Sequence, residues 1–474
     1  MTAADGANAA GGRGGRLLTP AMLGVASGAI LVPLNSTMLA VALPSVATAF
    51  GVGPSDVASL VTLYLGAVAV TLPASGSIGD RFGHRRSFVT GVLGFGAASL
   101  VAAFAPSFGV LAVSRVLQAA SGSLVSTSSV SLIRDLAPAD RRGAAFGVFD
   151  LLVSSSAAIG PLIGGLIVGA FDWRAMFLLA APIALVAVAS VGLRPPSARA
   201  WASADVTSDP HSHQPVPRPI DVWGLVTLGL VLIAFLAALR GGPTALPAAL
   251  IAAILLGAFL VLEVRSDSPA VDPHLFRSRS FSAAVIGVLG STVVLHATLV
   301  LVPLLVERLD GGDPEASGLV LLGISALGGV AAPFGGRWSD RAGRRTPVVV
   351  GSLVMAIGLA ALWWIAGSAS PLLLGILLAV VGLGMGFTSP RQAAALETVE
   401  PDRVGMAAGT YYTGRYLGGV LGASLAGAVL GGAVTAAGVT LGFGALAIVA
   451  LIVTVASFGL SGRVPHRASP AGRA

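Results

Sequence analysis

The chain has 474 residues, of which 55% are hydrophobic and only 10% are charged. Soluble domains carry roughly 25% charged residues, so the composition excludes an ordinary soluble protein and indicates a membrane protein. The formal net charge is +7, but this charge lies in short turns between apolar runs, which is typical of membrane topology rather than of nucleic-acid binding. No cysteine is present, which excludes disulfides, thiol chemistry and cysteine-based metal sites.

Apolar runs follow a short glycine- and alanine-rich tail at residues 1–16. The first run is too long for the apolar part of a signal peptide, which covers about 7–15 residues. A spanning helix needs about 20 mostly apolar residues. By that rule we expect fourteen spans, at residues 20–49, 57–79, 87–105, 108–132, 143–170, 174–193, 221–239, 244–264, 282–307, 315–337, 346–367, 370–394, 404–430 and 436–460.

The arginines between the spans predict the orientation. With the N-terminus inside, the outer loops carry only Arg174, Arg240 and Arg308, and the cytoplasmic segments carry most of the others. The positive-inside rule then predicts a multi-pass protein of the cell inner (plasma) membrane with both termini in the cytoplasm.

The hydrophilic stretch 194–220 predicts a flexible connector between two similar halves. Its His211 and His213 alone make a poor metal site, so we expect no metal. The corresponding residues of the two halves are Asp80 and Asp340, Asp135 and Glu397, and the runs 140–143 and 402–405. We therefore expect an N-terminal six-helix bundle at 1–193, a linker with two inserted spans at 194–281, and a C-terminal six-helix bundle at 282–474. Parallel repeats of this kind are a transporter design.

Short motifs occur in order along the chain, at residues 34–44, 76–85, 111–118, 147–165, 172–174 and 273–277. With these motifs the sequence resembles the major facilitator superfamily, and more closely its fourteen-span drug:proton antiporter branch. The resemblance implies an all-α integral membrane protein with the major facilitator fold, in which two six-helix bundles and two extra central helices make 14 transmembrane helices. It also implies alternating access driven by the proton gradient, with no other cofactor.

Several positions depart from the family pattern. The acid common in the first helix of the branch is Asn35 here, and His84 stands where arginine or lysine is usual. Ala40 replaces an asparagine of the first-helix motif, and glycines usual in later motifs are replaced at Ala119, Ser121 and Ser156. These departures argue against proton coupling through the first span and against a lipophilic cation as substrate.

Charged residues inside a bilayer are costly, so each is a functional candidate. For proton coupling we single out Asp150, Arg115 and His296. Asp150 could instead be a solvated helix start, Arg115 a structural tie to backbone carbonyls, and His296 a neutral core histidine. Candidates for the substrate cavity are Asn35, Gln118, Arg391, Tyr412, Arg415 and Tyr416. Tyrosines beside an arginine suit an aromatic or anionic ligand, although an aromatic belt at the membrane interface is the alternative.

Two further groups are expected to serve the conformational change. The fifth span carries Gly160, Pro161, Gly164 and Gly165, which allow close helix contact and a kink. These residues serve either packing alone or a seal against leak. The gating loops carry Gly76, Asp80, Arg81, Gly83, Arg85, Asp135, Asp340, Arg341, Arg344 and Glu397. We expect Asp80 at the start of the thirteenth span and Asp135 paired with Arg81 or Arg85. Asp340, Arg344 and Glu397 are expected to form the matching latch of the other half; a plain topological anchor is the alternative.

The sequence therefore predicts a proton-coupled exporter of drugs or secondary metabolites. The alternative is a proton-coupled uptake symporter, or a facilitator, of a small organic or anionic solute, because fold does not decide function. No Ser/His/Asp array or phosphate loop supports an enzyme. The expected partners are protons, the lipid bilayer and a neutral or anionic amphiphile, but no nucleic acid, and we expect a monomer.

Overall fold

The computed structural model describes residues 19–137, 142–192, 222–239, 243–266, 273–310, 314–365, 370–397, 399, 404–430 and 435–462. Within these ranges the regular structure is helical. The first helices are α1 (Pro20–Phe50), α2 (Pro54–Phe82), α3 (His84–Ala103), α4 (Phe108–Leu136), α5 (Arg142–Ala170), α6 (Trp173–Leu178) and α7 (Ala180–Gly192). A hairpin follows, made of α9 (Val222–Leu239) and α10 (Ala245–Arg265). The last group is η2 (Pro273–Arg277), α11 (Arg279–Asp310), α12 (Pro314–Ala342), α13 (Arg345–Ile365), α14 (Pro371–Phe387), α15 (Arg391–Leu396), α16 (Val404–Leu430) and α17 (Ala436–Ser457).

Local chemistry determines where the helices begin and end. Before α1, the Thr19 hydroxyl accepts a hydrogen bond from the Met22 N–H at 3.2 Å, and Pro20 needs no partner at the first position. Gly51 ends the helix with a φ of 63°, a left-handed conformation that favours glycine. Equivalent side-chain caps begin three later helices, at Ser107, Ser370 and Thr435.

Twelve helical segments of the described chain are long and apolar enough to cross a membrane. Fourteen transmembrane helices are therefore not confirmed. Two of the expected spans form helices that fall short of this criterion. The apolar part of α9 covers only Trp223–Ala238, and α16 carries three tyrosines and Arg415 among small residues. The sixth and twelfth expected spans are each one span made of two helices, α6 with α7 and α14 with α15.

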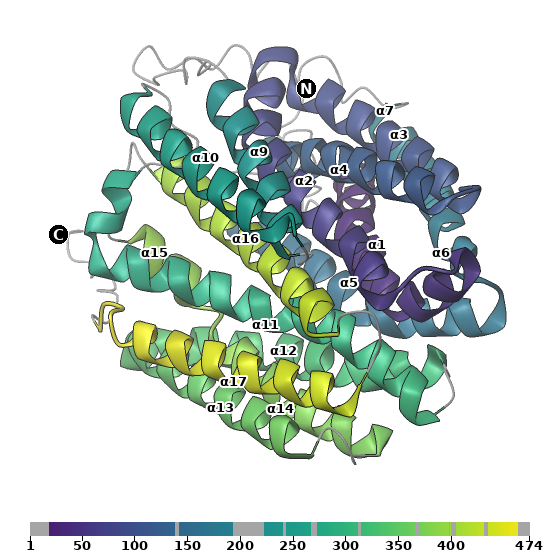
Figure 1. Cartoon of the computed structure of the whole chain (residues 1–474). Coiled ribbons are helices and arrows are strands. Elements are labelled where there is room, and N and C mark those ends of the chain that lie inside the picture. Colours follow the sequence, from purple (N-terminus) through teal and green to yellow (C-terminus); the bar gives the residue numbers. More distant parts are fainter. Residues whose placement is uncertain are drawn as a thin grey trace, which may run out of the picture.

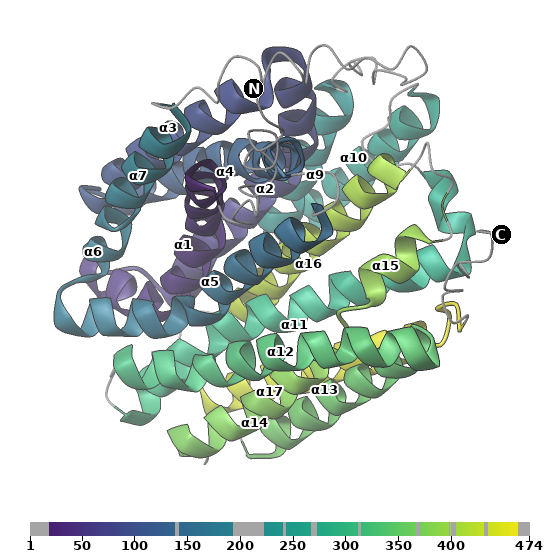
Figure 2. The same ribbon diagram turned by 180° about the vertical axis from the view of Figure 1, so that it is seen from behind.

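The helices pack into two groups (Figures 1 and 2). In the N-terminal half, α1 packs against α4, α5 and α7, and α4 packs against α2 and α3. In the C-terminal half, α11 packs against α16 and α17, α12 against α14, and α13 against α14 and α17. The halves meet along two seams, one between α2 and α16 and the other between α5 and α12, with α1 and α11 crossing between them.

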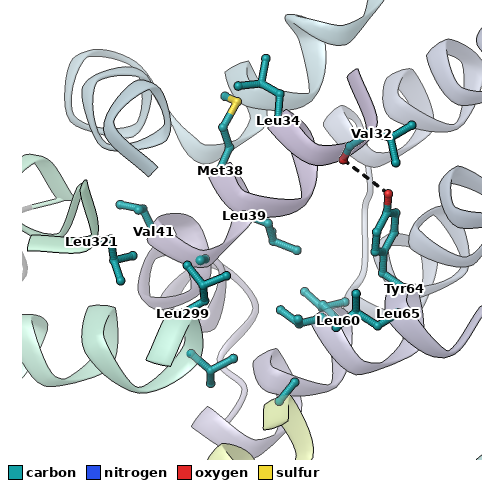
Figure 3. Close-up of a cluster of buried hydrophobic side chains, with 14 of the residues drawn as sticks. Val32, Leu34, Met38, Leu39, Val41, Leu60, Tyr64, Leu65, Leu299 and Leu321 are labelled. Atoms are coloured by element: carbon teal, nitrogen blue, oxygen red, sulfur yellow. Dashed lines mark hydrogen bonds between the residues drawn. The ribbon is translucent and has the colours of Figure 1, made fainter. Parts of the chain in front are cut away.

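Apolar side chains fill the place where the halves meet. Figure 3 shows part of this cluster, in which Met38 and Val41 of α1 lie with Leu60 of α2 and with Leu299 and Leu321 of the C-terminal half. All of these side chains are buried. The core therefore continues from one half into the other at this level.

Candidate functional site

Arg115 is the centre of a polar cluster inside the N-terminal half. Its side chain is fully buried in α4, where Nη1 donates to Asn35 Oδ1 at 2.7 Å and to Gln118 Oε1 at 2.8 Å. Its Cζ lies 4.2 Å from the centre of the Tyr64 ring, a cation–π contact. The predicted candidates Arg115, Asn35 and Gln118 are thus brought together, and α2 supplies a fourth member, Tyr64.

The partners of Arg115 are themselves held in place. Gln118 Nε2 donates to Ser99 Oγ of α3 at 2.7 Å, and the Tyr64 hydroxyl donates to the Val32 carbonyl at 3.5 Å (Figure 3). Four helices therefore orient one guanidinium. None of these partners is an acid, and Arg115 Nε has no protein partner. A buried cation without a carboxylate is costly, which favours a functional role over a purely structural one.

Sequence reasoning missed Tyr64 and Ser99 as members of this cluster. A signal for Tyr64 was present, because it is the one tyrosine of the chain outside α16 and lies within an apolar span. Ser99 is one of many serines in the N-terminal half, and nothing in the sequence distinguishes it. Only the packing of α3 on α4 brings it to Gln118.

In the C-terminal half, α16 carries the predicted aromatic and cationic residues. Tyr411 is buried with its ring 6.2 Å from that of Tyr412, whose hydroxyl accepts a hydrogen bond from Gln392 Nε2 at 3.2 Å. Tyr416 is partly buried, and Arg415 is exposed. Arg415 lies one helical turn before Gly419, so both residues lie on the same face of α16.

Gly419 marks the point where the two halves cross. A Cβ added to Gly419 would lie 2.8 Å from Leu65 Cδ1 of α2 and 3.2 Å from His296 Nδ1 of α11. The face that carries Arg415 is therefore turned toward the N-terminal half. His296 Nδ1 lies 3.0 Å from the Thr292 carbonyl, so this nitrogen carries the hydrogen and Nε2 keeps its lone pair. The imidazole can accept a proton beside the seam.

Arg391 occupies a different place from the other cavity candidates. It is buried at the start of α15, where Nη1 donates to the Gly287 carbonyl at 2.8 Å and to Ser291 Oγ at 2.9 Å. Nη2 donates to Ser352 Oγ at 3.3 Å. All three partners belong to the C-terminal half, so Arg391 ties α15 to α11 and α13.

The glycines of the fifth predicted span face two neighbours. A Cβ on Gly164 would lie 2.9 Å from the Met38 carbonyl oxygen of α1, and one on Gly160 would overlap the Thr37 hydroxyl of the same helix. A Cβ on Gly165 would lie 3.3 Å from Gly318 Cα of α12, and one on Gly318 would lie 2.7 Å from the Pro161 carbonyl oxygen. One glycine pair therefore holds α5 to its own half, and the other brings it against the opposite half.

Contacts of glycines across the halves are confined to one end of the molecule. They join residues 55–66 of α2 to 419–427 of α16, and residues 161–169 of α5 to 314–318 of α12. We call the other end, which carries residues 80–86 and 340–345, the arginine end. Toward that end a Cβ on Gly76, Gly329, Gly336 or Gly409 would meet nothing within 4 Å. We call the end where these cross-half contacts lie the tight end; none of the four glycines toward the arginine end makes such a contact.

Both gating loops turn on a glycine with positive φ, Gly83 at 88° and Gly343 at 78°. In the C-terminal half, Arg344 forms a two-pronged ion pair with Glu397, as the predicted latch requires. Asp340 and Arg341 are exposed beside it.

The latch predicted for the N-terminal half has different partners. His84 Nε2 lies 3.1 Å from Asp80 Oδ1, and Arg134 Nε lies 3.3 Å from Asp135 Oδ1. Asp135 was expected to pair with Arg81 or Arg85; it lies closer to its own neighbour in the chain. Arg81 instead stacks over Phe82, with its Cζ 5.6 Å from the ring centre.

One pair of matching contacts escaped sequence reasoning. Arg85 Nη2 donates to the Val191 carbonyl at the end of α7 at 3.0 Å, and Arg345 Nε donates to the Leu460 carbonyl just after α17 at 2.9 Å. Each arginine therefore satisfies a carbonyl at the end of the last helix of its own half. Asp150 lies in α5, but its side chain falls outside the described residues.

Comparison with known proteins gives consistent matches over most of the chain. The family described as the Major Facilitator Superfamily matches residues 25–423. The chain is 30% identical over 403 residues to the uncharacterized MFS-type transporter YwoD of Bacillus subtilis (strain 168), covering 84% of this chain and 87% of that one. It is 29% identical to the tetracenomycin C resistance and export protein of Streptomyces glaucescens, covering 85% and 74%. A riboflavin transporter of Clostridioides difficile (strain 630) is 26% identical, covering 84% and 85%.

Solved structures share the fold at low identity. A peptide transporter POT in complex with sulfate superposes with a TM-score of 0.67 at 17% identity, covering 92% of this chain and 93% of that one. A D-xylose–proton symporter gives 0.63 at 17% identity, covering 92% and 96%.

Proposed function

The chain belongs to the major facilitator superfamily, and from this we propose that it is a proton-coupled exporter of small amphiphiles. As a member of that family it is a multi-pass membrane transporter and not an enzyme. The proposal concerns the direction of transport, the coupling ion, the substrate class and the residues that serve them.

The proposal is supported mainly by the positions of two polar clusters. One is the Arg115 cluster, and the other consists of Tyr411, Tyr412, Arg415 and Tyr416 of α16. Tyr64, which stacks on Arg115, precedes Leu65, and Leu65 meets Gly419 on the same face of α16 as Arg415. The clusters therefore lie on facing helices at the level where the tight part of the seam ends. A solute bound between them would be reached from the arginine end in this state and from the opposite end after the halves rock.

The charge of these clusters favours a neutral or anionic amphiphile as substrate. Arg115 and Arg415 supply cations, and Tyr412 and Tyr416 supply aromatic surface for stacking. Asn35 and Gln118 add neutral polar groups. Arg391 adds a buried positive charge within the C-terminal half, where it joins α15 to α11. A lipophilic cation would meet like charge there. Cationic dyes proving the best substrates in vesicles would contradict this assignment.

Proton coupling is assigned to Asp150, Arg115 and His296. His296 has a free Nε2 lone pair next to the seam, and Arg115 is a buried cation without an acid partner. Asp150 is the acid that lies within α5. Alternating protonation of one of these groups would change the charge that a substrate meets between the halves.

Two features favour export. The glycine-rich part of α5 packs against α12 at the tight end, which suits a seal against leak, and relatives carry names of multidrug resistance and tetracenomycin export proteins. The alternative is uptake of a small organic or anionic solute, because one relative is named a riboflavin transporter. We assign both termini and the arginine end to the cytoplasm of the plasma membrane, and the protein acts as a monomer. There the loop residues Gly76, Asp80, Gly83 and Arg344 with their partners serve as the inner gate.

The test is transport into proteoliposomes under an imposed pH gradient, with a panel of neutral, anionic and cationic amphiphiles. Asp150→Asn should lose gradient-driven transport but keep exchange without a gradient. Asp172→Asn, an exposed acid before α6, is the matched control and should transport normally. Full gradient-driven transport by Asp150→Asn would remove it as the carrier. Uptake coupled to protons moving in the same direction would favour the symporter.

A further inference from the structure

The α9–α10 hairpin lies over one of the two seams between the halves. α9 packs against both α2 and α16, beside the place where these two helices meet (Figures 1 and 2). The seam between α5 and α12 has no third helix of the described chain packed on both of its members from the lipid side, since α1 reaches both from within the bundle. The two sides of the transporter are therefore not equivalent.

The hairpin is packed most closely against α2. A Cβ on Gly229 would lie 3.8 Å from Val70 Cγ2, and one on Gly66 would lie 3.8 Å from Leu232 Cδ1. Leu228, Val231 and Phe259 of the hairpin form a buried cluster, and Val70 of α2 packs against it. Glycines on both helices at their crossing allow the close approach that stabilises helix pairs in lipid.

The contact of α9 with α16 has no described glycine on the α16 side. The glycines of α16 face other helices: Gly414, Gly418 and Gly422 lie against α11, and Gly427 lies against Ala58 of α2. Gly419 lies against Leu65 and His296, and Gly409 meets nothing within 4 Å. No described glycine of α16 is therefore turned toward α9.

The chain connects the hairpin to the opposite half. Only residues 266–272 separate α10 from η2, and the helix that follows η2 is anchored in the C-terminal half. Phe281 is fully buried there, Ser280 Oγ donates to the Ala394 carbonyl at 3.3 Å, and Ser461 N–H donates to Ser280 Oγ at 3.3 Å. The short connection and the contact of α10 with η2 would make the hairpin move with the C-terminal half, whereas the packing of α9 connects it to α2.

We propose that the α9–α10 hairpin is fixed to α2, moves with the N-terminal half, and shields the α2–α16 seam from the bilayer while α16 slides along it. The proposal rests on alternating access by the two halves. It assigns a role to the inserted helices, because lipid and lipid-dissolved solutes can then approach the space between the halves only from the α5–α12 side.

Spin-label distances test this, since the chain has no cysteine of its own. One label is placed on Ile233 of α9 and the other on Leu93 of α3 or on Leu353 of α13, equivalent positions of the two repeats; all three side chains are exposed. A third pair, Gly76→Cys with Gly336→Cys, reports the separation of the halves at the arginine end.

The halves are driven apart at the tight end by Gly427→Leu, where even an added Cβ would lie 3.2 Å from Ala58 Cβ. Gly165→Leu does the same at the other seam if the first variant fails to fold. Gly257→Leu on α10 is the control, because a Cβ there meets nothing within 4 Å.

With Gly427→Leu or Gly165→Leu, the distance between the labels at positions 76 and 336 should shorten. The distance between the labels at 233 and 353 should change, and the distance between those at 233 and 93 should stay unchanged. A shift of the 233–93 distance with a constant 233–353 distance would overturn the proposal. An unchanged 76–336 distance would count against alternating access itself. The control variant should leave all three distances as in the parent.

Discussion

A single buried guanidinium, Arg115, connects four helices of the N-terminal half without help from an acid. Its hydrogen bonds to Asn35 and Gln118 are both to neutral side-chain carbonyls, so the cluster keeps a full positive charge. This charge is the physical reason for proposing a neutral or anionic substrate. It also makes Asn35, where the fourteen-span branch commonly has an acid, the residue at which substrate charge preference can be tested.

Asn35→Asp should shift the preference toward cations. A carboxylate in place of the Asn35 amide, whose oxygen lies 2.7 Å from Arg115 Nη1, would form a charge-assisted hydrogen bond and cancel the cluster's charge. Transport of an anionic amphiphile should fall and that of a lipophilic cation should rise, measured side by side in proteoliposomes. Gln118→Glu, which changes the other partner, should act in the same direction. Unchanged preference in both variants would show that the cluster's charge does not select the substrate.

Among the properties of single residues, the ion-pair partners of the surface charges were the hardest to predict from the sequence. The sequence named the loop residues, with Arg344 and Glu397 among them, but it did not show that Arg344 pairs with Glu397, that Asp135 lies nearest Arg134 or that Asp80 lies nearest His84. Several arginines lie within reach of each acid, and exposed pairs differ by less than about 1 kcal/mol, so spacing alone does not choose among them. His84 is shorter than the arginine usual there and pairs with Asp80 across the turn at Gly83.

At the scale of helix packing, the contacts of the α5 glycines give a specific prediction. Gly164→Ala should destabilise the protein by about 1–3 kcal/mol, because the new methyl group would lie 2.9 Å from a backbone oxygen of α1 that cannot move independently. The measurement is the thermal unfolding midpoint in detergent. Gly109→Ala at the start of α4, where nothing lies within 4 Å, is the control. Equal midpoints for the two variants would mean that α1 and α5 are not in contact.

The two matching arginine caps predict additive losses. Arg85→Ala and Arg345→Ala each remove a charged donor from the carbonyls that end α7 and α17, a loss of about 1.5–3 kcal/mol for a hydrogen bond made by a charged group. The sites lie in different halves, so the losses should add in the double variant. Unfolding midpoints of the parent, the two single variants and the double variant check this. A double variant no less stable than either single variant would contradict the prediction that the two caps act independently.

Hydropathy located most of the spans because an apolar run of the required length is a direct consequence of the bilayer. It did not locate the breaks at Leu179 and at residues 388–390, because average apolarity does not show where backbone hydrogen bonding stops. Pro390 was the one available signal for the second break. The polar residues of α16 kept it from meeting the apolar criterion, which is the same property that makes it a candidate for lining the substrate site.

At the scale of the whole molecule, the duplication was visible in the sequence, but the state of the seams was not. Repeated residues such as Asp80 and Asp340 predict two similar halves, and the turn glycines and arginine caps of the structure match in both. The end of the molecule at which the two halves meet is determined by contacts such as that of Gly165 with Gly318, which lie far apart in the chain. Single-sequence spacing carries no information about such contacts.

The proposed function requires the two halves to rock about the level of Leu65 and Gly419. The most direct test is the distance between spin labels on Gly76→Cys and Gly336→Cys, two equivalent positions at the arginine end where an added side chain meets open space. In proteoliposomes we predict two separated distances, with the longer one corresponding to the present structure and the proportions changing when a pH gradient is imposed. One distance that stays the same with and without the gradient would contradict the account.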